Sequence, residues 1–332
     1  MKDINNFIKL EENDSFSKLR GSDLQELLIQ ISEFNLTYRE TLNLPKRLTF
    51  GIEIEYEGII STFVNFFIKR KFPEWDSRKD LSLKFGGEIV SDILNDDIKT
   101  WKKLKTICIY LKKKNAITNK NAGGHIHVGT KIFKNNLDSW KIFIKTYLLY
   151  ENIIFRFGYG DKISARKDIL KYAPPCRKEL YRKIEKLYEA KKIVDLIGYI
   201  PTDKYLALNF SNIRFFQKWS SFYTKNTLEL RCPNATDEEI IWQNNINMFT
   251  KLILSSTKGT IDEDFIEYKI ENINPELFNN LYLYNEVNLK EALEFVDLIF
   301  DNNLDKIYFL KQYLKDFQNN YGCKNAIKAK KK

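Results

Sequence analysis

Three short segments of the 332-residue chain alternate polar residues that can bind ions with aliphatic residues, and this alternation constrains the fold most strongly. The segments are Glu53-Ile54-Glu55, His125-Ile126-His127 and Glu229-Leu230-Arg231. Residues two apart on a β-strand point to the same face, about 7 Å apart. Each segment is therefore predicted to be a strand with one aliphatic face toward a core and one face that can bind ions.

An ordinary amphipathic strand with one solvated face is the alternative interpretation of each pair, and we favour it for Glu229 and Arg231 taken alone. It fits His125 and His127 less well, because these are the only two histidines and they directly follow Gly123-Gly124, where a backbone or ligand can approach closely. It also fits Glu53 and Glu55 less well, because two neighbouring carboxylates repel unless a cation lies between them.

If the three polar faces converge, they bring together carboxylates, up to two imidazoles and one guanidinium. Sites rich in carboxylates suit Mg²⁺ or Mn²⁺ better than zinc. An arginine among metal-bound carboxylates favours an anion that bridges the metal and Arg231, most plausibly phosphate. The sequence contains no Walker loop, no GxGxxG before a helix and no serine-centred elbow. A phosphate would therefore be held by metals and Arg231.

The rest of the chain alternates between strand and helix patterns without an internal repeat, which predicts an α+β or mixed α/β fold with a helical C-terminal portion. Two candidate capping boxes begin at Ser22 and Thr236. Strands are predicted at 48–58, 88–91, 125–130, 205–210 and 227–232. Helices are predicted at 22–40, 61–70, 96–114, 140–154, 177–192, 236–254, 275–283, 289–300 and 303–318.

Composition excludes several classes of protein. No apolar run approaches the ~20 residues that a membrane span needs, and the N-terminus lacks an apolar signal region. The four cysteines are far apart with no CxxC spacing, which argues against a disulfide scaffold or a cysteine zinc site. We therefore expect a reduced, cytoplasmic protein.

The net charge of +10 is unevenly distributed. Basic residues dominate 99–120 and 162–192 and the tail after Cys323, whereas 262–305 is acidic. Solvated helix faces and a frayed tail explain most of these charges. A basic flank for an acidic partner, such as a nucleotide, an acidic peptide or nucleic acid, is the functional alternative. No nucleic-acid-binding motif accompanies the charge, so nucleic acid is the less favoured partner.

Five motifs, in this order, resemble those of the amidoligase family, which is similar to glutamine synthetase and glutamate–cysteine ligase. The resemblance covers about residues 46–255, with residues 1–45 as a helical extension and 256–332 as an acidic helical region with a basic tail. The motifs are Phe50-Gly51-Ile52-Glu53-Ile54-Glu55, Glu88-Ile89-Val90-Ser91, Asn121-Ala122-Gly123-Gly124-His125-Ile126-His127-Val128, Leu208-Asn209 and Thr227-Leu228-Glu229-Leu230-Arg231.

The resemblance implies a curved antiparallel sheet with flanking helices, whose concave face binds ATP and Mg²⁺ or Mn²⁺. It implies an ATP-dependent ligase that joins a carboxylate donor, such as a glutamyl group or a peptide, to an amine acceptor through an acyl phosphate. His127 would lie near the phosphates and Arg231 would hold the transferred phosphoryl group. The metal ligands would be Glu53, Glu55, Glu88, His125 and Glu229.

Other residues have less defined roles. Asp80 and Ser82 fit the family stretch less well, and Glu57 is a weak candidate for the general base. Asn209 is either a ligand or a buried strand residue. Arg166 and Lys204 are candidates for the acceptor site or simple surface charges.

Three other activities remain open from the sequence. They are a metal-dependent nuclease or phosphodiesterase, a kinase acting on guanidino compounds, and a nucleotide-binding protein without catalysis. Neither the substrates nor the oligomeric state can be read from the residues, so a homo-oligomer is compatible with them.

Overall fold

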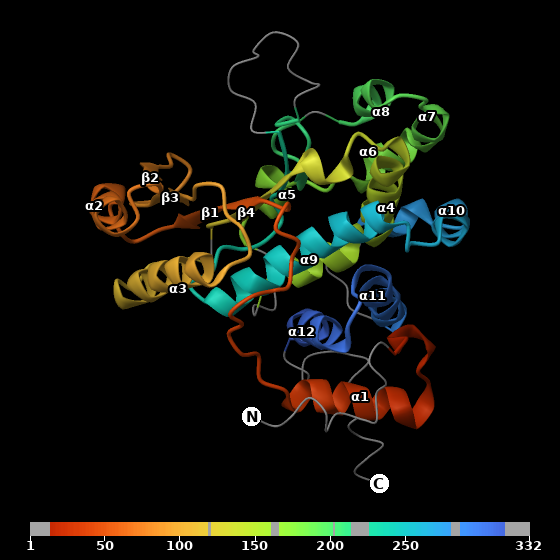
Figure 1. Ribbon diagram of the computed structural model, residues 1–332, viewed down its shortest axis with the longest axis horizontal. Helices are drawn as coiled ribbons and strands as arrows, with labels where there is room; N and C mark the ends of the chain where they lie inside the picture. The colour runs from red at the N-terminus through yellow and green to blue at the C-terminus, as the bar shows by residue number, and fades with distance from the viewer. Residues whose placement is uncertain are drawn as a thin grey trace.

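The strands form one antiparallel sheet with the order β2-β3-β1-β4-β6-β5, which lies against long helices (Figure 1). The computed structural model describes residues 14–118, 121–160, 166–201, 203–213, 226–279 and 286–315. The predicted mixture of strands and helices is confirmed. The strands are β1 (Phe50–Tyr56), β2 (Asp76–Lys79), β3 (Gly87–Val90), β4 (Gly124–Gly129), β5 (Leu208–Asn209) and β6 (Thr227–Leu230).

One face of the sheet is aliphatic and packs against helices. Ile54 and Ile126 are fully buried, and so are the aliphatic residues at the matching positions of β3 and β6. The helix α9 (Glu239–Lys258) packs against β4. It approaches so closely that a Cβ on Gly124 would lie 2.7 Å from the Trp242 ring. Burial of this face leaves the opposite, polar face of the strands free for chemistry.

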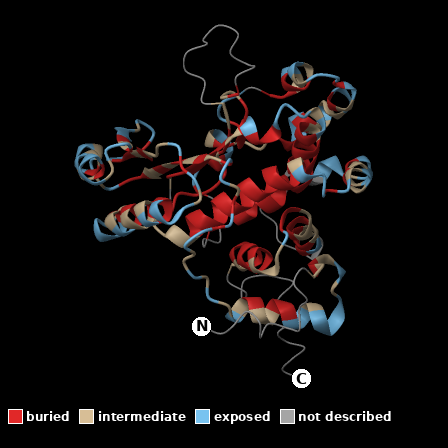
Figure 2. Ribbon diagram, in the orientation of Figure 1, coloured by how far each residue is buried: buried red, intermediate tan, exposed pale blue. Residues whose placement is uncertain are grey.

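Helix α4 (Leu137–Gly158) runs beside α9, and both are almost wholly buried (Figure 2). On the side of α9 away from the sheet lie α1 (Gly21–Glu33), α11 (Glu286–Ile299) and α12 (Asn303–Leu314) (Figure 1). None of the helices in the described part of the chain is long and apolar enough to cross a membrane.

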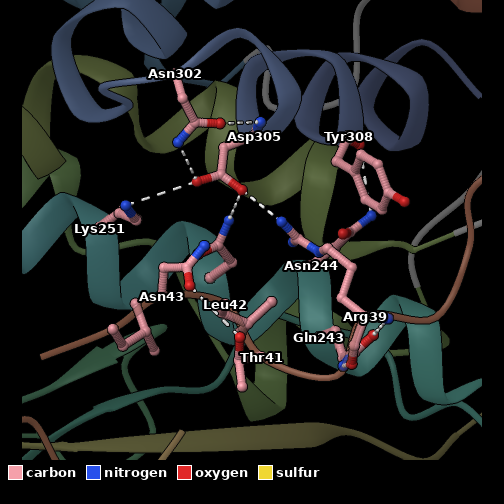
Figure 3. Close-up of polar contacts among 12 residues, drawn as sticks. Arg39, Thr41, Leu42, Asn43, Gln243, Asn244, Lys251, Asn302, Asp305 and Tyr308 are labelled. Carbon is pink, nitrogen blue, oxygen red and sulfur yellow. Dashed lines mark hydrogen bonds and ion pairs between the residues drawn. The ribbon is translucent and has the colours of Figure 1, made fainter. Parts of the chain in front are cut away.

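A buried ion cluster joins the two ends of the chain to α9 (Figure 3). The carboxylate of Asp305 on α12 accepts hydrogen bonds from Arg39 Nη1 at 2.5 Å, Asn247 Nδ2 at 2.8 Å and Asn302 Nδ2 at 2.9 Å. Lys251 Nζ of α9 lies 3.6 Å from the same carboxylate. The boundaries expected at 45/46 and 255/256 stay predictions, because these contacts say nothing of how each part folds alone.

Several predicted helix boundaries were wrong. The helix expected to reach residue 40 ends at Glu33, because the chain after it is extended and bonds elsewhere: the Arg39 backbone exchanges hydrogen bonds with Gln243. Ser22 lies inside α1 instead of capping it. Thr236 accepts from the backbone N–H of Glu238, before α9 begins.

The basic helix expected at 177–192 is interrupted at Lys183, whose φ of −110° is not helical, and it forms α6 and α7 instead. The elements β2, α8 and α10 were not predicted. The tail after Cys323 and part of the segment 275–283 lie outside the described residues. The remaining elements are α2 (Ser61–Lys71), α3 (Ile98–Lys113), α5 (Ile169–Tyr172), α6 (Arg177–Arg182), α7 (Ile184–Glu189), α8 (Ile193–Tyr199), α10 (Glu263–Glu271), η2 (Phe16–Lys18), η3 (Thr130–Phe133) and η5 (Pro275–Asn279).

Candidate functional site

The register of the sheet places the predicted polar residues on one face of neighbouring strands. In this register Glu53 is opposite His125, and Glu55 is opposite Glu88. Glu229 is opposite His127 on one side and Asn209 on the other. Because directly paired residues point to the same face, the side chains from five strands converge. The expectation that the three strands aim at one region therefore agrees with the geometry.

Glu53 lies at the centre of this face, between the two imidazoles. Its Oε2 is 3.0 Å from His125 Nδ1, and its Oε1 is 3.1 Å from His127 Nε2. Burial raises the pKa of the Glu53 carboxyl, but the hydrogen bonds and the charge of the two histidines outweigh burial and hold this pKa well below its usual value. Glu53 is therefore ionised over the physiological pH range.

His125 is buried, with 3% of its surface exposed, and carboxylates surround it. Its Nδ1 also lies 3.8 Å from Glu229 Oε1. Its Nε2 is 3.3 Å from Glu55 Oε1 but is buried without a hydrogen bond to any of the residues that the structure describes. A buried ring nitrogen left without a hydrogen bond among carboxylates fits a metal ligand.

Three side chains on this face meet the spacing for binding one ion. Ligand atoms of Glu53, His127 and Glu229 all lie within 4.8 Å of one another. The family resemblance assigned the ligand role to His125 and a place near phosphate to His127. Both imidazoles contact Glu53, so the division of roles between them stays a prediction. The oxygen-rich donor set fits Mg²⁺ or Mn²⁺.

Glu229 is held in place from two sides. Its Oε1 accepts from Arg231 Nη1 at 2.5 Å, and its Oε2 accepts from Asn209 Nδ2 at 2.8 Å. Burial raises the pKa of Glu229, but the charges of His127, His125 and Arg231 lower it further than burial raises it. Asn209 is thus a buried, hydrogen-bonded strand residue that orients Glu229.

The two remaining glutamates differ in their surroundings. Burial and the negative charge of Glu53 raise the pKa of the Glu88 carboxyl. Glu57 is 6% exposed, and its two oxygens accept from the backbone N–H of Lys84 and from Asn121 Nδ2, each at 2.7 Å. Because both oxygens hold neighbouring segments in place, Glu57 is poorly suited to act as a general base.

Two cavities of about 420 Å³ each flank the cluster at opposite ends of the strands. The first, which we call the Arg47 cavity, touches Glu53 and His127. The second, the Arg166 cavity, touches Glu55 and His125. The carboxylate and histidine cluster therefore forms the boundary between them, so a group bound there is within reach of molecules in both cavities.

The walls of the two cavities differ in charge. The Arg47 cavity offers two exposed cations and a more apolar wall, whereas the Arg166 cavity mixes cations with carboxylates. Lining residues of the first include Arg47, Thr49, Gly51, Ile93, Lys131 and Asn226. Those of the second include Asp80, Ser82, Arg166, Tyr172, Tyr205 and Arg231.

The residues with undefined roles differ in the structure by whether they line a cavity. Arg166 is buried and lines the second cavity, whereas Lys204 is exposed and lies over the Tyr205 ring. Asp80 and Ser82 line the same cavity, where Asp80 Oδ1 accepts from the Ser82 backbone N–H and hydroxyl, both at 2.7 Å.

Sequence reasoning did not find the other lining residues, such as Arg47, Lys131, Tyr172 and Tyr205. They lie outside the strand motifs. Of these four, only Tyr172 lies in the basic stretch 162–192, and no pattern in the sequence marks Arg47, Lys131 or Tyr205 as cavity residues.

Comparison with protein families gives one match. The family model described as "putative amidoligase enzyme" matches residues 68–253, which is more than half of the chain. This range contains β3, β4, β5 and β6 with their motifs, and it begins after the Glu53 strand. No curated protein matches the sequence.

Proposed function

Because the chain belongs to the amidoligase family, whose members are enzymes of the ligase type, we propose that it is an ATP- and magnesium-dependent carboxylate-amine ligase. The observation that supports this most directly is a face of carboxylates, imidazoles and one arginine that divides two cavities. Joining a carboxylate to an amine needs two sites beside one centre of phosphoryl transfer. The arrangement offers that geometry. We also propose that the sheet is curved as in glutamine synthetase.

Mg²⁺ or Mn²⁺ would be held by the carboxylates and by His125, whose Nε2 is buried and has no hydrogen bond within the described part of the chain. When bound, the ion neutralises the phosphate charge that builds up during transfer. His127 makes a second contact with Glu53 and lines the Arg47 cavity, on the side proposed for the nucleotide. The proposed ligands are Glu53, Glu55, Glu88, His125 and Glu229.

ATP would occupy the Arg47 cavity, where Arg47 and Lys131 offer positive charge and the wall is more apolar. The carboxylate donor and the amine would occupy the Arg166 cavity. A carboxylate oxygen attacks the γ-phosphorus, the bond to ADP breaks, and an acyl phosphate forms. The amine nitrogen then attacks the acyl carbon, and inorganic phosphate leaves with the bonding electrons.

Arg231 would bind the phosphoryl group during its transfer. Its Nη1 is bonded to Glu229, while its Nε is buried in the wall of the Arg166 cavity and has no hydrogen-bond partner among the described residues. A guanidinium grips two phosphate oxygens with its planar fork, and this interaction strengthens as charge shifts to those oxygens. Glu229 and Asn209 keep the fork in place.

The proton released by the amine needs an acceptor in the same cavity. Glu57 has both oxygens engaged. Asp80 uses only Oδ1 in hydrogen bonds with Ser82. We therefore place Asp80 ahead of Glu57 as the general base.

A hydroxylamine assay tests the ligase. Hydroxylamine replaces the amine and converts any acyl phosphate to a hydroxamate. The full chain is incubated with Mg²⁺, ATP, hydroxylamine and a panel of carboxylic acids, and hydroxamate, ADP and phosphate are measured. We expect equal amounts of the three products with the right acid. Arg231→Lys should abolish them, and Arg70→Lys, exposed on α2 and outside both cavities, should not.

Other product patterns would contradict the ligase. ADP formed with a phosphorylated guanidino compound, and no hydroxamate, would indicate a kinase. Cleavage of nucleic acid without ATP would indicate a nuclease. Binding of ATP with no turnover across the panel would leave only a nucleotide-binding protein.

A further inference from the structure

We propose that Arg166 binds a second carboxylate of the donor acid, so that the enzyme activates dicarboxylic acids in preference to monocarboxylic ones. This inference rests on the proposed function and names its substrate class. It is based on a guanidinium that is buried in the wall of a cavity and has no carboxylate of the described residues beside it.

The Arg166 side chain is fixed by backbone groups alone, as far as the described part of the chain extends. Its Nη1 donates to the carbonyl of Pro233 at 2.5 Å, and its Nη2 donates to the carbonyl of Arg231 at 3.0 Å. A guanidinium has five N–H groups. The other three have no acceptor among the residues that the structure describes. The residue is only 4% exposed, yet it lines the Arg166 cavity.

Other buried cations of this protein have a carboxylate or an aromatic ring beside the charged group. Lys145 lies 2.5 Å from two carboxylates, and Lys306 lies 3.0 Å from Asp297. Arg177 also lacks an ion pair in the described part, but its guanidinium is covered by the Phe278 ring at 4.4 Å. Arg166 combines burial, a position in a cavity wall and, among the described residues, the absence of a carboxylate within 4.0 Å.

A buried cation without a counter-ion is costly unless a ligand completes it. Burial, together with the nearby positive charge of Arg231, lowers the pKa of Arg166, while the negative charge of Glu55 opposes this. An anion entering the cavity would meet both guanidinium groups. A carboxylate fits the remaining N–H groups, because the guanidinium fork matches two carboxylate oxygens.

Gly123 sets the position of the guanidinium. A Cβ on this residue would lie 2.9 Å from Arg166 Cζ, so the absence of a side chain lets the guanidinium lie against the backbone that enters β4. The same peptide donates its N–H to the Glu55 carboxylate. The Arg166 fork is thereby fixed beside the polar face, in the same cavity wall as Arg231.

The cavity also carries carboxylates, and the charge of one of them, Glu55, acts on Arg166. Glu55 contacts His125 and the Gly123 N–H, Glu57 is bonded to Lys84 and Asn121, and Asp80 is bonded to Ser82. These carboxylates would attract the amine. A dicarboxylic acid would then place its reacting carboxylate toward Arg231 and its second one on Arg166.

Binding of matched acids tests the inference without relying on turnover. The pairs are glutarate with glutaramate, succinate with succinamate, and L-glutamate with L-isoglutamine; each pair differs by one charge. Calorimetry with Mg²⁺ and a non-hydrolysable ATP analogue measures their affinities for the full chain. We expect the better dicarboxylate to bind about 10- to 100-fold more tightly than its monoamide, as for one hydrogen-bonded charge pair.

Variants separate recognition from structural damage. Arg166→Gln should bring the two affinities within about threefold, and Arg166→Lys should retain part of the difference. Gly123→Ala, which displaces the guanidinium without removing its charge, should also reduce the difference, and it covers the case in which Arg166→Gln does not fold. Lys171→Gln, exposed and outside the cavity, should retain the whole difference.

Equal binding of every pair by the wild type, or an unchanged ratio in Arg166→Gln, would overturn the inference. A uniform loss for both members of a pair would show that Arg166 holds the phosphoryl group or supports the fold, and it would also overturn it. The ligase is judged separately by hydroxamate formation. Selective binding without hydroxamate would support the role of Arg166 in binding the second carboxylate and contradict the ligase activity. Hydroxamate without selective binding would support the ligase activity and contradict that role of Arg166.

Discussion

Two regions of this protein bury carboxylates among cations, and they do so for different purposes. Around Asp305, one carboxylate accepts three side-chain hydrogen bonds from α9, α12 and the N-terminal segment (Figure 3). Around Glu53, several carboxylates share two imidazoles, and the Nε2 of His125 has no hydrogen bond as far as the chain is described. In the first cluster the Asp305 carboxylate is bonded by groups of the chain itself, whereas the second cluster, in our proposal, is completed by a ligand.

This difference follows from what surrounds each cluster. Asp305 lies between packed helices, away from both large cavities of the sheet face. The Glu53 cluster lies between those cavities, and its like charges repel one another. Loss of a carboxylate should therefore cost stability in the first region and activity in the second.

The largest effect is expected for Arg231→Lys, which should lower kcat by about 10³-fold or more, the range for an arginine that stabilises phosphoryl transfer. Lysine keeps the charge but cannot align two phosphate oxygens. Hydroxamate formation at saturating ATP measures the loss, and a melting curve checks the fold. Activity within a few-fold of wild type in a folded variant would remove Arg231 from the catalytic residues.

The next effect concerns stability. Asp305→Asn should lower the free energy of unfolding by about 3–5 kcal/mol, because the Arg39 side chain, only 12% exposed, loses its carboxylate. Urea unfolding measures the change, with Asp264→Asn on the exposed surface of α10 as the control. The kcat of the folded fraction should stay unchanged. A stable Asp305→Asn protein with low activity would contradict the division between the two regions.

The third effect, of intermediate size, is the rise in stability when Mg²⁺ and ATP bind, and it should distinguish the two regions. Mg²⁺ and ATP at a hundredfold excess over Kd should stabilise the wild type by about 2.7 kcal/mol and raise its Tm by several degrees. Asp305→Asn should show the same rise from a lower starting Tm. Glu53→Gln should show little rise, because one carboxylate is lost from the cluster. Equal shifts in all three proteins would exclude Glu53 as a ligand.

The smallest effect is a change of stability with pH. The pKa of Glu88 is raised by burial and by Glu53, so its ionisation is less favourable in the folded state. The free-energy cost of ionising Glu88 in the folded protein is absent at pH below the unfolded pKa of about 4.3. This cost develops as the pH rises toward the folded pKa, and it persists above that pKa. With EDTA present, Glu88→Gln should gain less than about 1 kcal/mol at pH 7 and nothing near pH 3. A loss of stability at pH 7 would contradict the sign.

Much of the candidate site could be predicted because β-strands repeat every two residues. Glu53, His125 and Glu229 each belong to a short polar-aliphatic alternation, and this local pattern is enough to place them on strand faces. The antiparallel pairing of Glu53 with His125 and of His127 with Glu229 comes from the structure, because the motifs alone do not specify a register. The helices α3 and α4 were likewise predicted, because their apolar residues recur at helical spacing.

Other features depend on contacts between distant parts of the chain, which no local pattern encodes. Sequence spacing allowed Glu57 as a base, but the structure engages both its oxygens with Lys84 and Asn121. The helix expected to reach residue 40 ends early because Arg39 bonds to Gln243 and Asp305, more than 200 residues away.

The order of residues alone indicates which side chains can bind ions and on which strands they lie, since the alternation of side chains is a local property of the backbone. Which of these groups stay without a partner depends on tertiary packing. Arg166 and Lys204 look alike as basic residues in the sequence. One is buried against Gly123 at a cavity wall and the other is exposed. Burial and the presence of a counter-ion arise from the packing of distant segments, and they make the arginine a candidate recognition group and leave the lysine a surface charge.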